Sequence, residues 1–407
     1  MNILSNTKIN WKISSSYSRS HSTDMNDTSL ERFKSFITNE LAPWESAAAS
    51  NKMNLRAVRI KVARRSSELG FFQMTQPKSV GGNPASRSEL VLLWETLASA
   101  NLPIVEGYVF GPGAGVLRNA TGLLRERYME PVLRGELTGS FGFTEPPELQ
   151  KRTTAIKSKD GSELIVEGVK SYVTGGDVAD FVAVMCNLLE SDGVTRAGTA
   201  LVIVPTGERG VSIDRVFRTM DDNMPGHAYM RFSSVRVPSW SVVGKAGGRG
   251  GMDSALQQIG SVRLRMSAVA VGLASWALDY ARKHLNQPHK RSGKKLAGKE
   301  GVQLRFAELY VDVLAARSML YRTAHLLDLK DSTGSDALAA TKVFTTEVAG
   351  RVVDGCVQLC GGMAIVIGNP LEAAYKRVRQ WRFAEGASDL LRIKIAKGVL
   401  LREESRL

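Results

Sequence analysis

The stretch QWRFAEGASDLLRIK, residues 380–394, holds two carboxylates, Glu385 and Asp389. Glu385 stands directly before a glycine and the start of a helical pattern. A carboxylate in such a place could act as a general base and remove a proton from a substrate. It could also do no chemistry, because acidic residues near a helix N-terminus interact favourably with the helix dipole and Ser388 could be the N-cap. This stretch alone leaves both interpretations open.

The three cysteines are the other residues whose side chains could bind a metal or react. They are Cys186, Cys356 and Cys360, and such an odd, sparse count argues against a disulfide framework and favours a reducing compartment. Cys356 and Cys360 are four residues apart on a helical pattern, so they share one helix face. No histidine or second cysteine pair lies near them in the sequence, which favours core packing over metal binding. We therefore expect a cytoplasmic protein without a metal site.

The elements that must position these residues change type twice along the chain. Apolar residues recur every three or four positions between Ser29 and Arg134, which predicts helices. From about Gly139 to Val243, short β-branched and aromatic runs bounded by glycine, aspartate and proline predict strands. The helical spacing then returns in three long segments that are typical of an antiparallel bundle. These segments are residues 264–285, 302–329 and 337–359.

This order of helices, strands and helices predicts three domains after an N-terminal extension. The first 24 residues are rich in serine and asparagine and have little apolar periodicity. Such a segment could be transit-like, but a disordered extension or a misassigned start fits its composition better. The predicted parts are a disordered extension (1–24), an N-terminal helical domain (25–136), a central β domain (137–246) and a C-terminal helical bundle (247–407).

The charge balance indicates an acidic partner. The chain has 54 lysines and arginines against 40 aspartates and glutamates, a formal net charge of +14. Nucleic acid, a phosphorylated ligand or an acidic protein would all suit such a surface. The basic residues concentrate at 281–299 and 376–382, and neither stretch has a helix-turn-helix, zinc-finger or RRM signature, so we do not expect nucleic-acid binding. Without a run of about 18 apolar residues, we also expect no membrane span.

Five short motifs carry a resemblance to a known family. They are ELGFFQMTQPKSVGG (68–82), GSFGFTEP (139–146), GVKSYVTGG (168–176), VQLCGG (357–362) and FAEGAS (383–388). Each motif is weak alone, but the five occur in the order found in the acyl-CoA dehydrogenase family, which the chain resembles from about residue 29 to 402. The resemblance implies an α+β fold with an N-terminal α-helical domain, a central antiparallel β domain and a C-terminal four-helix bundle. It also implies a homotetramer that binds FAD.

The resemblance gives Glu385 a chemical role. In much of this family the glutamate of the last motif removes the α proton of an acyl thioester, while hydride leaves the β carbon for flavin N5. Burial beside flavin and substrate would raise the pKa of this carboxylate and strengthen it as a base. Other members place the base on the first long helix of the C-terminal domain, where GSVRLR offers Ser261, Val262 and Arg263 but no carboxylate. We therefore predict Glu385 as the base and Arg263 as a substrate contact.

The resemblance also implies which residues contact the flavin ring. Tyr172 stands where the family has a tryptophan, so an aromatic plane for stacking is kept. The predicted contacts are Phe141, Phe143 and Thr144 at the pyrimidine edge, Tyr172 at the ring face and Thr174 near N5.

The rest of the FAD would be held near the end of the chain. Glycines in the VQLCGG turn permit close approach of the backbone to the adenosine half. The family's arginine that reaches the FAD phosphate is replaced by His289. The predicted contacts are His289 at the phosphate, Gln358, Gly361 and Gly362 from a neighbouring subunit, and Ala387 and Ser388 on the adenine side.

Further departures indicate a divergent member of the family. Ser292 replaces a phenylalanine, and Lys376 and Arg377 replace an arginine–aspartate pair. PELQKR after Pro146 replaces a glycine-serine-aspartate loop that usually helps to hold the FAD pyrophosphate and the pantetheine arm. We expect a biosynthetic enzyme that acts on acyl-CoA or on acyl groups of an acidic carrier protein. Its electron acceptor would be a flavoprotein or O₂.

Two other functions stay open at this point. A flavin oxidase or monooxygenase of the same fold, acting on a non-thioester substrate, would explain the altered loop after Pro146. A flavin-poor binding protein on an inherited fold would explain that loop and His289. The retained Glu385 favours the dehydrogenase over both.

Overall fold

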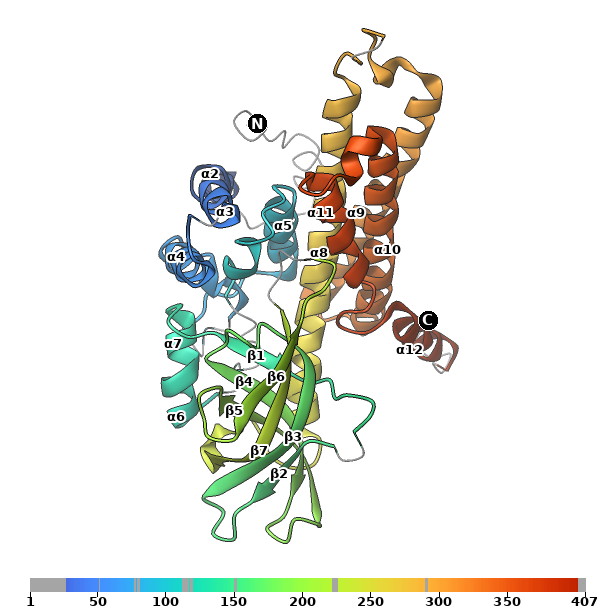
Figure 1. The fold of residues 1–407 in the computed structure, drawn as a ribbon. Coiled ribbons are helices and arrows are strands. Elements are labelled where there is room, and N and C mark those ends of the chain that lie inside the picture. The colour runs from blue at the N-terminus through green and yellow to red at the C-terminus, as the bar shows by residue number, and fades with distance from the viewer. Residues whose placement is uncertain are drawn as a thin grey trace. The chain divides into compact units, whose positions relative to one another are not determined.

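The computed structural model of the protein describes residues 27–50, 52–76, 78, 81–111, 117, 120–149, 152–221, 226–289 and 292–401. These residues form two compact units (Figure 1). Within the described ranges, the helical unit comprises 27–47, 86–106 and 263–401, and the sheet unit comprises 48–85 and 107–262. The predicted extension, 1–24, lies outside the described residues.

The sheet unit is built on seven strands. Their order is β1-β4-β2-β3-β7-β6, with β5 paired to β4. β1 and β2 run parallel to β4, and all other pairs are antiparallel. The five longer strands are those that the sequence pattern predicts. The strands are β1 (Gly139–Gly142), β2 (Thr154–Lys157), β3 (Glu163–Thr174), β4 (Phe181–Leu189), β5 (Arg196–Pro205), β6 (Val211–Phe217) and β7 (His227–Pro238).

Strand β4 has a core on each of its two faces, which explains why FVAVMCNLL is apolar at every position except Asn187. Phe181 and Ala183 pack in one core with Met129 and Leu133 from the short helices beside the sheet. Val182 and its i+2 neighbours pack in the other core, inside the curled sheet. The helical elements of this unit are α4 (Leu55–Glu68), η2 (Phe72–Thr75), η4 (Glu106–Tyr108, whose first residue belongs to the helical unit), α6 (Gly122–Leu124), η5 (Arg125–Met129), α7 (Glu130–Leu133) and η6 (Ser239–Ser241).

The helical unit contains the three long C-terminal helices that the sequence pattern predicts. Helix α10 packs against α9, α11 and α12 (Figure 1). Helix α8 begins among residues of the sheet unit and continues into the helical unit at Arg263. The elements are α2 (Asp27–Phe36), η1 (Ile37–Leu41), α3 (Ala42–Ala49), α5 (Arg87–Ala98), α8 (Gly250–Leu285), η7 (Leu296–Gly298), α9 (Glu300–Asp328), α10 (Gly334–Cys360), η8 (Gly362–Ile365), α11 (Pro370–Gln380) and α12 (Ser388–Leu400).

Helices α5, α8 and α9 are joined by a buried polar cluster. The Arg317 Nε atom donates to Glu95 Oε1 at 2.6 Å, and its Nη2 atom donates to the Ser275 hydroxyl at 2.8 Å. A capping box between Ser86 and Glu89 begins α5. Within the part of the chain that the structure describes, none of the helices combines the length and the apolar character needed to cross a membrane.

Candidate active site

The turn between α11 and α12 places Glu385 in an unusual backbone conformation. Glu385 has a φ of 56° and Gly386 a φ of 106°, both in the left-handed region. The Arg263 Nε atom donates to the Glu385 carbonyl oxygen at 2.8 Å, and the Lys342 Nζ atom donates to the Gly386 carbonyl oxygen at 2.8 Å. Non-glycine residues seldom adopt such a conformation, and those that do cluster at functional sites. Two cations therefore fix the two carbonyls at the position of the predicted base.

Burial and the neighbouring cations shift the pKa of Glu385 in opposite directions. Burial raises the pKa of the Glu385 carboxyl, while the charges of Arg263 and Lys342 lower it. Burial and the charge of Arg263 together lower the pKa of Lys342 to about 8, although Glu385 and Glu347 act to raise it. A carboxylate whose pKa is raised by burial is a stronger base than an exposed one. The arrangement suits proton abstraction by Glu385.

The alternative explanation for Glu385, a helix-start role, is weakened by the residues that follow it. Ala387 is the N-cap of α12 and has no capping side chain, so the interpretation of Ser388 as the N-cap is wrong. Ser388 is the first residue of the helix, is buried, and donates through its N–H to the Arg382 carbonyl oxygen at 2.9 Å. The acidic residue in the first turn of α12 is Asp389, whose side chain is 92% exposed. The helix-dipole role belongs to Asp389.

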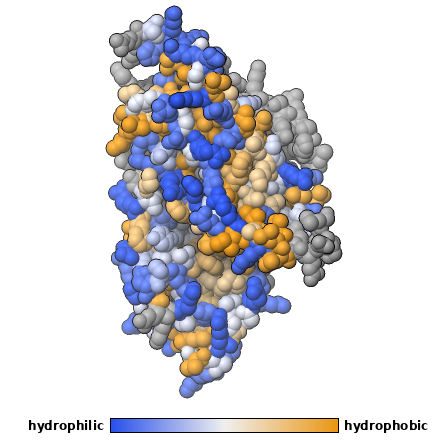
Figure 2. Space-filling model, turned by 90° about the vertical axis from the view of Figure 1, so that its right-hand side faces the viewer, coloured by the Kyte–Doolittle hydropathy of each residue, from blue (hydrophilic) through white to orange (hydrophobic). Residues whose placement is uncertain are grey.

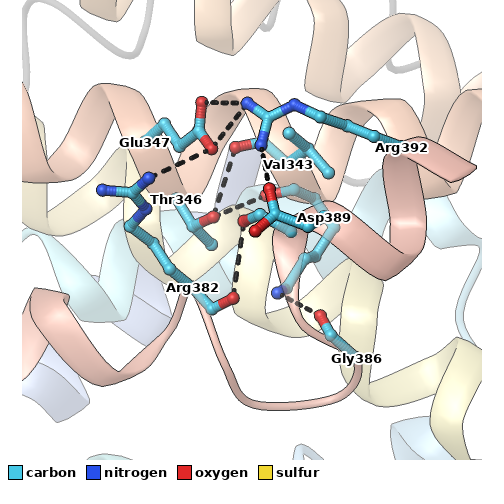
Figure 3. A network of polar contacts seen from close by, with 9 residues as sticks. Val343, Thr346, Glu347, Arg382, Gly386, Asp389 and Arg392 are labelled. Carbon is cyan, nitrogen blue, oxygen red and sulfur yellow. Dashed lines mark hydrogen bonds and ion pairs between the residues drawn. The ribbon is translucent and has the colours of Figure 1, made fainter.

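Glu347 on α10 holds the loop that carries Glu385 through Arg382 and Arg392, and we call these three residues the brace (Figure 3). Glu347 accepts two hydrogen bonds of 2.8 Å from Arg392 Nη2 and forms an ion pair with Arg382 at 3.6 Å. Arg392 also donates to Asp389 at 3.2 Å. The loop is therefore fastened to α10 both before and after Glu385.

In the sheet unit, a bulge turns Tyr172 toward solvent. The register of β3 against β7 shifts between Lys170 and Val173, and Tyr172 has a φ of 54°. Its side chain is 59% exposed and stacks on Phe217, with ring centroids 5.2 Å apart and planes 16° apart. The guanidinium of Arg215 lies 4.7 Å from the centre of the Phe217 ring. The result is a supported aromatic surface with one exposed face.

The other predicted flavin contacts of the sheet unit lie around this bulge and at the end of β1. The Phe141 and Phe143 rings lie 5.8 Å apart, and the Thr144 carbonyl oxygen accepts from the Ser171 N–H at 2.9 Å. The Thr174 hydroxyl lies 3.0 Å from Nδ1 of His227, its partner on β7. Thr144 and Thr174 are exposed, so their outer groups are available to a ligand.

Sequence reasoning missed the ion pair that supports this region. Lys170 Nζ donates to Glu145 Oε1 at 2.9 Å and to the Phe143 carbonyl oxygen at 3.3 Å, and Lys170 is buried. Burial lowers the pKa of Lys170. Burial also acts to raise the pKa of Glu145, but its contacts with Lys170 and Thr153 outweigh this and the net shift is downward. A lysine among the apolar residues of a strand was the available signal.

The residues predicted at the adenosine half occupy the end of α10. Gly361 ends the helix with a φ of 75°, and the space around Gly361 and Gly362 is open. Gln358 is exposed on the last turn. His289 is exposed in a turn where its N–H donates to the Lys294 carbonyl oxygen at 3.0 Å, while Lys290 and Arg291 lie outside the described residues.

The remaining reactive candidates have ordinary packing roles. Cys356 is buried on α10 and Cys360 is partly buried, and both are free thiols. Among the residues that the structure describes, no group of three histidine, cysteine, aspartate or glutamate side chains could hold a metal ion. Arg377, a departure from the family pattern, is buried and pairs with buried Glu106 at 3.0 Å. Its charge is therefore compensated inside the helical unit.

Comparison with protein families decides the identity of the fold. Sequence models of the acyl-CoA dehydrogenase N-terminal, middle and C-terminal domains match residues 23–136, 140–235 and 249–400. The chain belongs to the acyl-CoA dehydrogenase family. Members of this family are FAD-dependent oxidoreductases that act on CH–CH groups, so the predicted fold and class of enzyme are confirmed.

Individual relatives in the acyl-CoA dehydrogenase family are distant but span nearly the whole chain. Benzylmalonyl-CoA dehydrogenase from Aromatoleum aromaticum is 27% identical over 386 residues, which covers 93% of this chain and 98% of that protein. Acryloyl-CoA reductase (NADH) from Anaerotignum propionicum is 26% identical over 347 residues and covers 83% and 86%. The crystal structure of a probable acyl CoA dehydrogenase from Mycobacterium abscessus matches with a TM-score of 0.79 and 25% identity, covering 91% and 98%.

Proposed function

We propose that this protein is an acyl-thioester dehydrogenase in which Glu385 removes the α proton of the substrate as an α,β double bond forms. Bound FAD would supply the acceptor for the hydride that leaves the β carbon. The observation that carries the proposal is the partly buried Glu385 carboxyl, whose pKa is raised by desolvation, in a turn whose carbonyls are fixed by Arg263 and Lys342. The stretch from Ser261 to Arg265 offers no second carboxylate.

The residues of the sheet unit fit a planar cofactor. Tyr172 exposes an aromatic face that Phe217 supports from behind, which suits stacking against a flavin. The neighbouring Ser171 hydroxyl is buried and has no hydrogen-bond partner among the described residues. Buried polar groups normally have a partner, so a missing one indicates a ligand or a water. Phe141, Phe143, Thr144, Tyr172 and Thr174 would hold the flavin ring.

Arg263, predicted as a substrate contact, binds the turn that carries Glu385. Its Nε atom is occupied by the Glu385 carbonyl oxygen, and its Nη2 atom lies 3.1 Å from the place where a Cβ atom on Gly386 would be. We infer that Arg263 acts first on the turn that carries the base, and that any substrate contact is made through its remaining N–H groups. The φ of 106° at Gly386 favours glycine at this position, because other residues rarely adopt that conformation.

The substrate would be an acyl group held as a thioester. The two relatives described above are named for CoA esters, one as a dehydrogenase and one as a reductase. Anaerobic bleaching of the flavin by a panel of acyl-CoA and acyl-carrier thioesters tests the proposal. Because one relative is named for the reverse direction, the reduced enzyme should also be mixed with α,β-unsaturated thioesters. If no thioester changes the flavin spectrum in either direction, the oxidase or monooxygenase becomes the better proposal.

We expect a homo-oligomer, most simply a tetramer, when the protein is examined by light scattering. Figure 2 shows hydrophobic residues gathered on the face of the molecule that carries α12. Large exposed apolar patches mark interaction surfaces. A monomer with full flavin content would contradict this expectation. The exposed apolar side chains of this C-terminal region include Met363, Ile365, Ile367, Phe383, Leu390, Leu400 and Leu401.

The basic stretch from Arg282 to Lys299 has no acidic residue and could steer an acidic carrier protein. Steering acts mainly on the association rate and is screened by salt, with a Debye length of about 8 Å at physiological ionic strength. The second-order rate with a carrier-bound substrate should therefore fall steeply with added salt. The rate with a small pantetheine thioester of the same acyl group should change little.

A charge reversal separates steering from cofactor binding. Lys283 already pairs with Asp279 at 2.7 Å, so Lys294 and Lys295 are the better positions to change. Replacing both with glutamate should slow the carrier-bound substrate and spare the pantetheine thioester. Loss of flavin from this variant, or equal salt dependence for both substrates, would end the carrier-protein proposal and leave a free CoA thioester as substrate.

A further inference from the structure

Lys342 is a buried lysine in the middle of α10. Its side chain is 0% exposed, and its ammonium group donates to the carbonyl oxygen of Gly386 at 2.8 Å. Among the residues that the structure describes, no carboxylate forms an ion pair with it. The hydroxyl of Thr346 is turned back to the Lys342 carbonyl oxygen at 2.8 Å, so it does not solvate the charge. A buried cation bonded to a neutral carbonyl is costly and asks for an explanation.

The backbone hydrogen bond alone does not explain a lysine here. A neutral donor such as glutamine could satisfy the Gly386 carbonyl oxygen without burying a charge. The brace formed by Glu347 with Arg382 and Arg392 also fastens this loop to α10 (Figure 3). What lysine supplies and glutamine does not is a positive charge that interacts with Glu385. The charged groups facing Lys342 are Arg263 on α8, Glu385 in the turn and Glu347 on α10.

We propose that Lys342 is a positioning residue for the base, and that its positive charge holds the Glu385 turn in place and keeps the Glu385 carboxyl ionised. This inference rests on the proposed function of Glu385. Arg263 and Lys342 contact consecutive carbonyls from two different helices, so neither can substitute for the other. Arg263 keeps its charge at every working pH, whereas Lys342 can lose a proton and so makes the positioning of the base depend on pH.

The proposal predicts a particular pH profile. Glu385 must be ionised to act, so the rate of flavin reduction falls as pH falls through the pKa of Glu385. Since the pKa of Lys342 is about 8, the rate also falls above that pH, because the neutral amine binds the Gly386 carbonyl oxygen less strongly and no longer holds the turn in place. Lys342→Met removes the alkaline fall and moves the acid fall to higher pH, because one of the two cations that lower the pKa of Glu385 is gone. The maximal rate should drop about tenfold to a hundredfold, as expected for a displaced reacting group.

Two further variants separate charge from packing. Lys342→Arg keeps a cation that does not titrate, so it should lose the alkaline fall while its acid fall stays near that of the wild type. Lys342→Gln keeps a donor for the Gly386 carbonyl oxygen without the charge. It should show the same pH profile as predicted for Lys342→Met, and it tests that profile if the methionine variant fails to fold. The matched control is Lys394→Met, which removes an exposed lysine that donates to the Ser335 hydroxyl on α10. It should leave both limbs unchanged.

An infrared titration tests the inference without relying on activity. The difference between spectra of the wild type and of Glu385→Gln isolates the protonated carboxyl of Glu385 at each pH. With Lys342→Gln as the background, the same difference should show Glu385 titrating at higher pH. An unchanged titration of Glu385, or a rate loss that is uniform across pH, would overturn the proposal. If no thioester reduces the flavin of the wild type or of any variant, the proposed function fails. The infrared titration still decides the role of Lys342 in that case.

Discussion

Glu385→Gln should lower the rate of flavin reduction at least about a hundredfold while FAD stays bound, because a lost general base costs roughly that much or more. Glutamine has nearly the same shape as glutamate but cannot accept a proton. Its backbone can keep the hydrogen bond from Arg263 to the carbonyl oxygen at position 385. Rapid mixing with substrate under anaerobic conditions measures the rate, and the absorbance of bound flavin measures the cofactor.

The first turn of α12 offers a matched control for this substitution. Asp389 lies four residues further on, is 92% exposed and pairs with Arg392. Asp389→Asn removes the same charge from the first turn of α12, next to the loop, without touching the Glu385 carboxyl, so it should reduce flavin at nearly the wild-type rate. Near-normal reduction by Glu385→Gln would remove Glu385 from the mechanism. Equal losses in the two variants would mean that the loop, and not the base, had been damaged.

The pH dependence of the rate of flavin reduction also tests whether Glu385 is the base. Burial raises the pKa of Glu385 above 4.5, so the ionised base is lost as pH falls through that raised value. The acid limb of the wild-type rate profile should therefore lie above pH 4.5, and the residual rate of Glu385→Gln should lack it. An acid limb that persists in the variant would assign the titration to another group.

Much of the fold could be predicted because the spacing of apolar residues along a strand or helix follows from which of its faces are buried. The alternating faces of β4 pack into two separate cores, so eight of its nine residues are apolar, Asn187 being the exception. The long α9 and α10 carry clear helical spacing. The four-residue strands β1 and β2 are too short to show alternation, and they form because β4 and β3 pair with them. Helix α11 was missed because basic residues dominate KRVRQ, although Leu371, Ala374 and Val378 are buried.

The candidate site was predictable where a motif carried it and not where the chain returns from afar. Glu385 and Arg263 were both predicted, and the structure brings them together although 122 positions separate them. Lys342 was not predicted, since it lies 44 positions before its partner Gly386 and within no motif. Its signal was a single lysine on the buried face of α10, between Leu338 and Thr346. Such a residue cannot be recognised from apolar spacing alone, because a single lysine in a long helix usually lies at the surface.

Backbone strain could not be foreseen from residue types. Glutamate and tyrosine have no general tendency toward the left-handed region, yet Glu385 and Tyr172 both occupy it. At Glu385 the conformation is imposed by Arg263 and Lys342, which hold the carbonyls from two other helices. At Tyr172 it is imposed by the bulge where β3 slips against β7. Both depend on contacts that are distant in sequence.

Arg317→Met should lower the free energy of unfolding by about 3–5 kcal/mol, which is the usual cost of removing one partner from a buried ion pair. The side chains of Arg317 and Glu95 are only 5% and 2% exposed, and their atoms are 2.6 Å apart. The variant leaves the Glu95 carboxylate buried and uncompensated between α5 and α9. It also removes the donor to the Ser275 hydroxyl on α8. The urea midpoint, at fixed protein and FAD concentration, measures the effect.

Two further variants show whether this loss comes from the unpaired charge. Arg351 and Asp312 join α10 to α9 at 3.0 Å, but their side chains are 52% and 31% exposed. Arg351→Met should therefore cost no more than about 1 kcal/mol. The double variant Glu95→Leu with Arg317→Met should recover most of the stability lost in Arg317→Met, because apolar side chains of similar volume often replace a buried ion pair without penalty. A double variant no more stable than the single one would show that the hydrogen-bonded geometry of the pair, and not the stranded charge of Glu95, holds the three helices together.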